Sequence, residues 1–277
     1  MSLPRKIIRK GLRVFERLES KLSESEAPFM KAFVSYGEAK EACSTTSPYQ
    51  DTDLVDVVFA KTVRYIKILS HDKSVSKNEL NFLFFLTQLF TKDAISVIDV
   101  GGACGAHYFF LRKMLPDAVH LTWRVVETPA MAKKASHLAR DELSFHTDIK
   151  EAAHGRMVDA VLVSGVLQYL PDPYDFLKKI LGVKPGYISI HRTPFFEGDQ
   201  EAVYIQKSRL AHNGIGPLPE GFSDRLVEYP ETTMSLNKFR SILDRNYEVF
   251  AEWDQYHDHS IPGRERLVFS SCYRLKK

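Results

Sequence analysis

Cysteine is scarce in this chain, which has three among its 277 residues. Cys43, Cys104 and Cys272 lie far apart and form no C-x-x-C pair, so neither a structural zinc site nor a disulfide framework is expected, and a reducing compartment is the default. Long apolar runs are also missing, because the longest one, at residues 82–90, is about half of the roughly 20 residues that span a bilayer. We therefore expect a cytoplasmic protein without a transmembrane helix or a signal peptide.

A large excess of one charge is missing as well, because 38 Lys and Arg face 35 Asp and Glu for a net charge of +3. Residues 5–21 hold seven basic and two acidic side chains, so this segment carries +5 and the rest of the chain −2. The apolar spacing predicts an amphipathic helix over residues 5–22. Its basic face either contacts the anionic inner membrane surface or is simply solvated. The slightly acidic remainder, without an aromatic-basic RNA motif, argues against a nucleic-acid partner.

The N-terminal third reads as a helical cap. Residues 53–69 have helical apolar spacing, and Ser76 and Glu79 form a capping-box pattern ahead of a Phe- and Leu-rich run at 80–90. The polar residues 23–52 read as a loop. We therefore divide the chain into an N-terminal helical cap at 1–92 and a second domain at 93–277.

The second domain alternates short β-rich runs with helical segments. This alternation predicts an α/β fold, a doubly wound, Rossmann-like and mostly parallel sheet of seven strands. The expected strands are residues 95–100, 121–126, 144–146, 159–164, 187–191, 247–253 and 266–273.

Residues 194–233 interrupt this alternation. The segment contains four glycines and four prolines, which predicts a long irregular insertion. Because such loops are uncommon unless they act as lids or binding elements, we expect the insertion to face a ligand.

Residues suited to ligand binding follow the expected strands. In an open parallel sheet, ligands bind beyond the carboxyl ends of the strands. Glycines after the first strand allow a close backbone approach, and a carboxylate after the second strand is placed to accept hydrogen bonds from ribose hydroxyls. The residues at these positions are Asp99, Gly101, Gly102, Gly105, Glu127, Thr128, Asp148, Ser164, Gly165, Gln168, Tyr169, His191 and Arg192.

Three of these segments together resemble a known superfamily. Residues 97–105 (VIDVGGACG) are similar to the first motif, D-x-G-x-G-x-G, of the class I S-adenosylmethionine-dependent methyltransferases, and residues 125–129 (VVETP) are similar to the second. Residues 159–173 resemble the fourth-strand motif. One departure is Ala103, which stands at the middle glycine of the first motif. More loosely, residues 33–39 and the Gly101-Gly102 doublet resemble a bacterial subgroup associated with surface-polysaccharide genes.

The resemblance implies S-adenosylmethionine (SAM) as the cofactor, with the following contacts. Asp99 and the backbone from Gly101 to Gly105, Ala103 included, would face its methionine part, and Glu127 would hold the ribose. Thr128 would pack by the adenine, and Asp148 would receive the adenine's amine or, alternatively, cap the next helix. Ser164 and Gly165 would flank the sulfonium.

The expected reaction is methyl transfer to a small-molecule or glycan acceptor at oxygen. His191, Tyr169 and His107 are the candidate catalytic residues, with His191 first as a base, although each can instead line the pocket. Arg192, Tyr204 and Gln206 are the candidate acceptor-binding residues. His257 and His259 resemble a metal pair only superficially, and no metal is expected.

Two other interpretations stay open. A nicotinamide or nucleotide-sugar enzyme also uses glycines after strand one and an acid after strand two, although the G-x-G-x-x-G spacing is missing. A catalytically inert cofactor-binding module could present the helical cap to a partner.

Overall fold

The computed structural model describes residues 31–44, 51–69, 71, 79, 82, 85–89, 91–261 and 264–277, and only the backbone for 254–261 and 264. The predicted basic helix at 5–22 lies outside the described residues, as does most of the capping-box segment. Within the described part, no helix is long and apolar enough to cross a bilayer.

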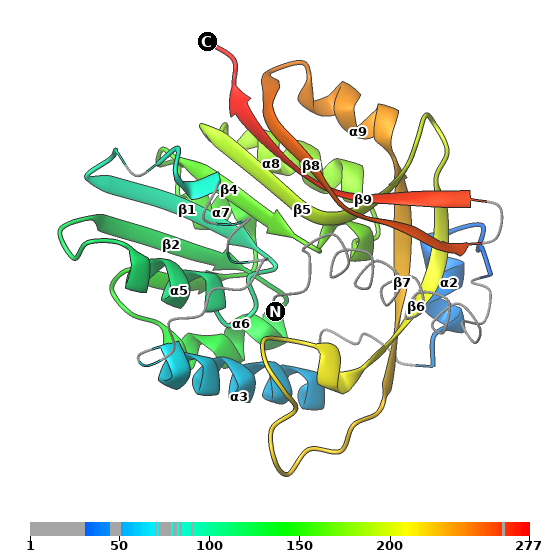
Figure 1. Ribbon diagram of the computed structural model, residues 1–277, viewed down its shortest axis with the longest axis horizontal. Helices are drawn as coiled ribbons and strands as arrows, with labels where there is room; N and C mark the ends of the chain where they lie inside the picture. Colours follow the sequence, from blue (N-terminus) through cyan, green and yellow to red (C-terminus); the bar gives the residue numbers. More distant parts are fainter. Residues whose placement is uncertain are drawn as a thin grey trace, which may run out of the picture.

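A mixed sheet forms the centre of the molecule (Figure 1). Five parallel strands run in the order β3-β2-β1-β4-β5, and β9 pairs antiparallel with both β5 and β8. All seven predicted strands are confirmed. Their bounds are β1 (Ala94–Val100), β2 (His120–Val126), β3 (Leu143–His146), β4 (Ala160–Ser164), β5 (Tyr187–Phe196), β8 (Tyr247–Ile261) and β9 (Arg264–Leu275).

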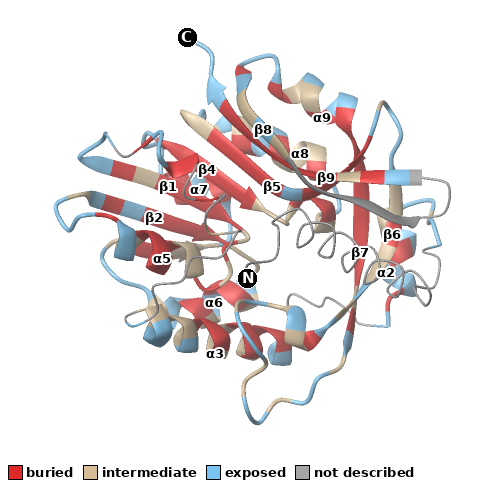
Figure 2. Ribbon diagram, viewed as in Figure 1, coloured by how far each residue is buried: buried red, intermediate tan, exposed pale blue. Residues whose placement is uncertain are grey.

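Helices cover both faces of this sheet. The parallel strands are largely buried (Figure 2). Their alternate side chains enter two separate apolar clusters, one on each face of the sheet. One cluster holds Ile98 and Val100 with α7 (Ile149–Ala153), α8 (Pro173–Gly182) and α9 (Leu236–Leu243). The other holds Val97 with α5 (Ala106–Met114). This arrangement confirms a Rossmann-like, doubly wound fold.

The predicted irregular insertion is a β-hairpin, so the sheet has nine strands rather than seven. β6 (Ala202–Arg209) pairs antiparallel with β7 (Leu226–Ser235), and β7 runs parallel to the end of β5 at Phe195 and Phe196. The prediction was wrong because most of the glycines and prolines gather in the turn after β5 and in the loop between β6 and β7. That loop begins with the short 3₁₀ helix η4 (Leu210–His212).

The described N-terminal elements lie around the open end of this sheet. α3 (Thr52–Leu69) confirms the helix predicted at 53–69 and packs on α5 and on α6 (Pro129–Ala135), while α6 is followed by η2 (Ser136–Leu138). The segment predicted as a loop contains α2 (Tyr36–Ala42), which packs on β6 and β7 and is capped by the Ser35 hydroxyl. The carboxyl ends of β1, β4 and β5 therefore face a space bordered by α3 and the hairpin (Figure 1).

Candidate active site

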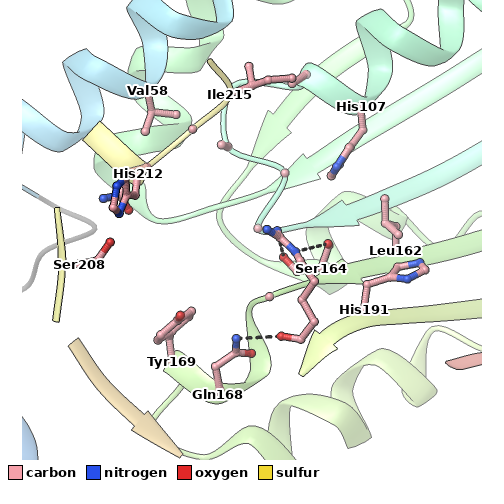
Figure 3. A pocket seen from close by; sticks show the side chains of 18 of the residues that line it. Val58, His107, Leu162, Ser164, Gln168, Tyr169, His191, Ser208, His212 and Ile215 are labelled. Carbon is pink, nitrogen blue, oxygen red and sulfur yellow. Dashed lines mark hydrogen bonds between the residues drawn. The ribbon is translucent and has the colours of Figure 1, made fainter. Parts of the chain in front are cut away.

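One cavity of about 740 Å³ opens at the carboxyl ends of the parallel strands. Its volume is in the range of small-molecule sites. Figure 3 shows that its side chains come from distant parts of the chain, with Val58 on α3, His107 on α5 and Ser208 on β6. The predicted residues that line it are Gly101, Gly102, Ala103, His107, Glu127, Ser164, Gly165, Tyr169, His191, Arg192 and Gln206.

The loop between β1 and α5 is shaped by its two adjacent glycines. Gly101 has a left-handed backbone with φ of 68°, and a Cβ there would lie 2.2 Å from Val166 Cγ2. A Cβ at Gly102 would lie 2.3 Å from Asp99 Oδ2. No side chain fits at either position, so the loop backbone itself forms this part of the cavity wall.

Ala103 takes the left-handed conformation that a glycine would adopt at this position, with φ of 49°. Its N–H donates to Glu127 Oε1 at 3.0 Å, which ties the loop to the end of β2. The departure from the glycine motif is therefore accommodated at the cost of some backbone strain. Gly105, with φ of 80°, begins α5 and does not line the cavity.

Glu127 is a partly buried carboxylate at the end of β2. Its Oε1 accepts from Ala103, and its Oε2 accepts from the Thr128 N–H at 2.8 Å. Burial raises the pKa of Glu127 to about 7, against the lowering effect of these two backbone hydrogen bonds. A carboxylate held in this way stands in the cavity as a hydrogen-bond acceptor for hydroxyl groups.

Asp99 is fully buried behind the glycine loop and does not itself line the cavity. Its Oδ2 faces His107 Nδ1 at 3.0 Å and accepts from Trp123 Nε1 at 3.3 Å. Its Oδ1 has no hydrogen-bond partner among the described residues. The His107 ring also packs on Phe82, with 5.0 Å between ring centroids. Asp99 therefore orients a histidine that reaches the cavity.

His191 is buried at the end of β5, where its Nε2 lies 2.5 Å from Ser189 Oγ. Its Nδ1 is buried without a hydrogen-bond partner among the described residues. Burial, reinforced by the nearby His107 and Arg192, lowers the pKa of His191 to about 3. The ring is thus neutral at physiological pH and has little affinity for a proton.

A β-bulge follows His191. The register of β5 against β9 shifts between Ile190 and Thr193, and Arg192 within the bulge has a left-handed backbone with φ of 52°. Its guanidinium turns back to β4, where Nε donates to Ser164 Oγ at 3.2 Å and Nη2 donates to the Ser164 carbonyl at 3.1 Å. The bulge therefore sets an arginine beside the Ser164–Gly165 turn.

Tyr169 belongs to the 3₁₀ helix η3 (Leu167–Tyr169), which faces the hairpin. Its hydroxyl donates to Gln206 Oε1 at 2.5 Å, and its ring lies 5.7 Å from that of Tyr229 on β7. Burial raises the pKa of the Tyr169 hydroxyl well above its usual value, so this group is a hydrogen-bond donor at neutral pH.

Besides Asp99 and Gly105, three more predicted site residues lie outside the cavity lining. Asp148 is exposed and caps α7, where it accepts from the Lys150 and Glu151 N–H groups at 2.8 and 3.0 Å. Of the two roles considered for Asp148, the structure therefore shows the helix cap. Thr128 caps α6, and Met131 on that helix lines the cavity in its place. Tyr204, on β6, is buried against Phe196 and does not line the cavity.

The cavity lining also contains residues that were not predicted as site residues. Glu231 on β7 and Arg266 on β9 form a buried ion pair, with 3.0 Å between Oε2 and Nη1. Tyr229 also lines the cavity, and so does Gln168, which the sequence already places after the fourth strand beside Tyr169. Alternation of apolar and polar residues within β6 and β7 could have identified the inward-facing positions of the hairpin. The ion pair could not have been identified in this way, because β7 and β9 do not neighbour each other in the sheet. The side chains of His257 and His259 lie outside the description, and the described residues contain no cluster suited to a metal ion.

No protein-family model and no curated protein sequence matches this chain. Solved structures of methyltransferases resemble parts of it. A SAM-dependent methyltransferase from Clostridium acetobutylicum aligns over 79% of this chain and 99% of its own length, at 13% identity and a TM-score of 0.47. The amino pentose methyltransferase CalS10 from Micromonospora echinaspora aligns over 72% and 92%, at 14% identity and a TM-score of 0.42. The N-methyltransferase NodS from Bradyrhizobium japonicum aligns over 78% and 100%, at 14% identity and a TM-score of 0.42. At this distance the activity has to be argued from the site itself.

Proposed function

We propose that the protein is a SAM-dependent methyltransferase that acts on a small, carbohydrate-like acceptor at oxygen. The observation that carries this proposal is the joining of the glycine loop after β1 to the Glu127 carboxylate after β2, through the Ala103 N–H, in the wall of one cavity. The glycine loop lets a ligand approach its backbone closely, and the Glu127 carboxylate can accept hydrogen bonds from hydroxyl groups. Together these features fit a nucleoside cofactor with an amino-acid tail.

Bound SAM would supply a methyl group made electrophilic by a positively charged sulfur. Glu127 would accept hydrogen bonds from the ribose hydroxyls, and the backbone from Gly101 to Ala103 would contact the methionine part. The Ser164–Gly165 turn would lie near the reacting centre. Because methyl transfer is an in-line displacement, alignment by these groups supplies most of the catalysis.

The chain's own candidate for a base is now His107 rather than His191. The buried Asp99 carboxylate holds Nδ1–H of His107, which leaves Nε2 to take a proton from an acceptor hydroxyl. His191, with its lowered pKa, and Tyr169, with its raised pKa, are better suited to hydrogen bonding with the acceptor. We expect His107→Asn to lower turnover by about 10²-fold or more with unchanged cofactor affinity. A loss no larger than that caused by His191→Asn would contradict this assignment.

Calorimetry with S-adenosylhomocysteine (SAH), SAM and NAD tests the cofactor. We expect SAH and SAM to bind, NAD not to bind, and Glu127→Gln to weaken SAH binding by about tenfold or more. The exposed Glu248→Gln is the matched control. Tight NAD binding without a response to SAH would refute the proposal. SAM binding without SAH production from any glycan acceptor would instead favour the inert module.

The basic N-terminal segment stays a separate proposal. Residues 5–22 would hold the enzyme at an anionic membrane surface, where polysaccharide precursors are available. Co-sedimentation with anionic liposomes should fall when residues 1–22 are deleted, and unchanged co-sedimentation would count against the idea.

A further inference from the structure

A buried carbonyl oxygen in the cavity wall has no hydrogen-bond donor. Gln168 is 4% exposed, and its Nε2 donates to the Arg192 carbonyl at 3.1 Å. That contact fixes the orientation of the Gln168 amide, because the Arg192 carbonyl can accept a hydrogen bond only from the amide nitrogen. Gln168 Oε1 is left buried without a partner among the described residues. A buried acceptor of this kind is stabilised by a donor, so the site suits a ligand with a hydroxyl group.

An uncompensated positive charge lies on the same wall. The Arg192 guanidinium contacts the Ser164 hydroxyl and carbonyl, and it forms no ion pair with any described carboxylate. The cavity's other arginine, Arg266, is offset by Glu231. Arg192 is also held in a left-handed backbone conformation, and strain of this kind gathers at ligand sites. The guanidinium is therefore free to bind a carboxylate of a ligand.

Aromatic rings border the same end of the cavity. Tyr169 and Tyr229 lie ring to ring, and their hydroxyls are engaged by the amides of Gln206 and Asn213. Tyr169 directly follows Gln168 in η3, and Gln168 Nε2 contacts the Arg192 carbonyl, so these three residues lie side by side. The ring pair, the charge and the orphan carbonyl therefore lie close to one another. Tyrosine rings offer an apolar face with polar edges, which suits the carbon face of a hydroxylated ring.

We propose that the part of the cavity between η3, the β5 bulge and the hairpin binds an acidic pyranoside, a sugar ring that carries a carboxylate. The carboxylate pairs with the Arg192 guanidinium, a ring hydroxyl donates to Gln168 Oε1, and the carbon face of the ring packs on Tyr169 and Tyr229. This inference rests on the proposed function, because the pyranoside is the methyl acceptor.

The test compares two probes that differ only at carbon 6, which is a carboxylate in one and a hydroxymethyl group in the other. Methyl β-D-glucuronide and methyl β-D-glucoside are titrated by calorimetry into the full-length protein saturated with SAH. We expect the glucuronide to bind about tenfold or more tightly than the glucoside, as a charge-assisted hydrogen bond predicts. Equal affinities, or no binding of either sugar to the SAH complex, would overturn the inference. If SAH itself does not bind, the proposed function fails first, so the two failures are distinguishable.

Two variants assign the preference to residues. Arg192→Gln should remove the preference for the glucuronide while SAH and glucoside affinities stay unchanged, and Gln168→Leu should weaken both sugars about equally. Arg240→Gln, at a half-buried arginine that does not line the cavity, is the control, and a thermal melt checks that each variant is folded. If Arg192→Gln instead weakens SAH binding and keeps the sugar preference, the arginine serves the cofactor and the inference is wrong.

Discussion

Glu127 makes the stability of this protein depend on pH in a way that can be measured without any substrate. Burial raises the pKa of its carboxyl to about 7, whereas in the unfolded chain the group titrates near 4.5. Between these values the folded state keeps a proton that the unfolded state has lost. Its contribution to stability is therefore fully present below the unfolded pKa and is lost as the pH rises through the folded pKa.

The size of the effect follows from the two pKa values. One pKa unit corresponds to about 1.4 kcal/mol, so this group alone lowers the free energy of unfolding by about 2.5 kcal/mol between about pH 5 and about pH 8. Glu127→Gln removes the titration. It also leaves one of the two backbone N–H groups without its acceptor, at a cost of about 1–3 kcal/mol at every pH. The pH-dependent part can therefore be separated from the constant part.

Urea denaturation of the wild type and of Glu127→Gln at these two pH values measures the difference directly. Relative to the wild type, the variant should gain about 2.5 kcal/mol on going from the lower to the higher pH. Glu248→Gln, at an exposed ion pair with Arg274, is the control and should show no comparable gain. A difference between variant and wild type that does not change with pH would refute the claim that Glu127 is forced toward its neutral form in the fold.

Three further predictions concern the packing around the cavity. Gly102→Ala should destabilise the protein by about 2 kcal/mol or more, because the new Cβ would lie 2.3 Å from Asp99 Oδ2; an unchanged urea midpoint would contradict the close approach. Arg266→Met should cost about 3–5 kcal/mol by removing the ion pair of the buried Glu231, and adding Glu231→Leu should restore most of it; a loss in the double variant equal to the sum of the two single losses would rule out coupling. Lys61→Met should lower the free energy of unfolding by about 2–3 kcal/mol and speed proteolysis of the loop after β6, because the buried ammonium donates to two carbonyls of that loop at 2.6 and 2.7 Å. Proteolysis as slow as in the wild type would argue that these hydrogen bonds do not hold the loop.

The sheet was readable from the sequence because its strands are buried on both faces. Residues 95–100 and 159–164 form short, nearly continuous apolar runs, which are typical of parallel strands buried on both faces. The hairpin at β6 and β7 was not readable, since the glycines and prolines around it masked two strands that gain their stability from pairing with each other and with β5. Pairing between distant segments leaves no local pattern.

The site shows the same division. Glu127 and the glycine loop could be predicted because each directly follows a strand, and the carboxyl ends of parallel strands meet at one edge of the sheet. Which of His107 and His191 is the better candidate for a base could not be predicted in this way. His191 follows its strand as expected, yet the surrounding side chains bury it, and burial disfavours the charged ring. The role proposed for His107 depends on its contact with Asp99, which is made only when the chain turns from β1 into α5.

The sequence by itself determined the parallel sheet, the positions where ligand-binding residues leave it, and the scarcity of cysteine that argued against zinc and disulfide frameworks. Only the tertiary structure decided which of those residues share a cavity and what their charges are. Gln168, Arg192, Glu231 and Arg266 come from four separate elements, and their significance lies in burial and in partners supplied by other segments. The physical reason is that desolvation and ion pairing depend on the whole surroundings of a group, which local sequence does not encode.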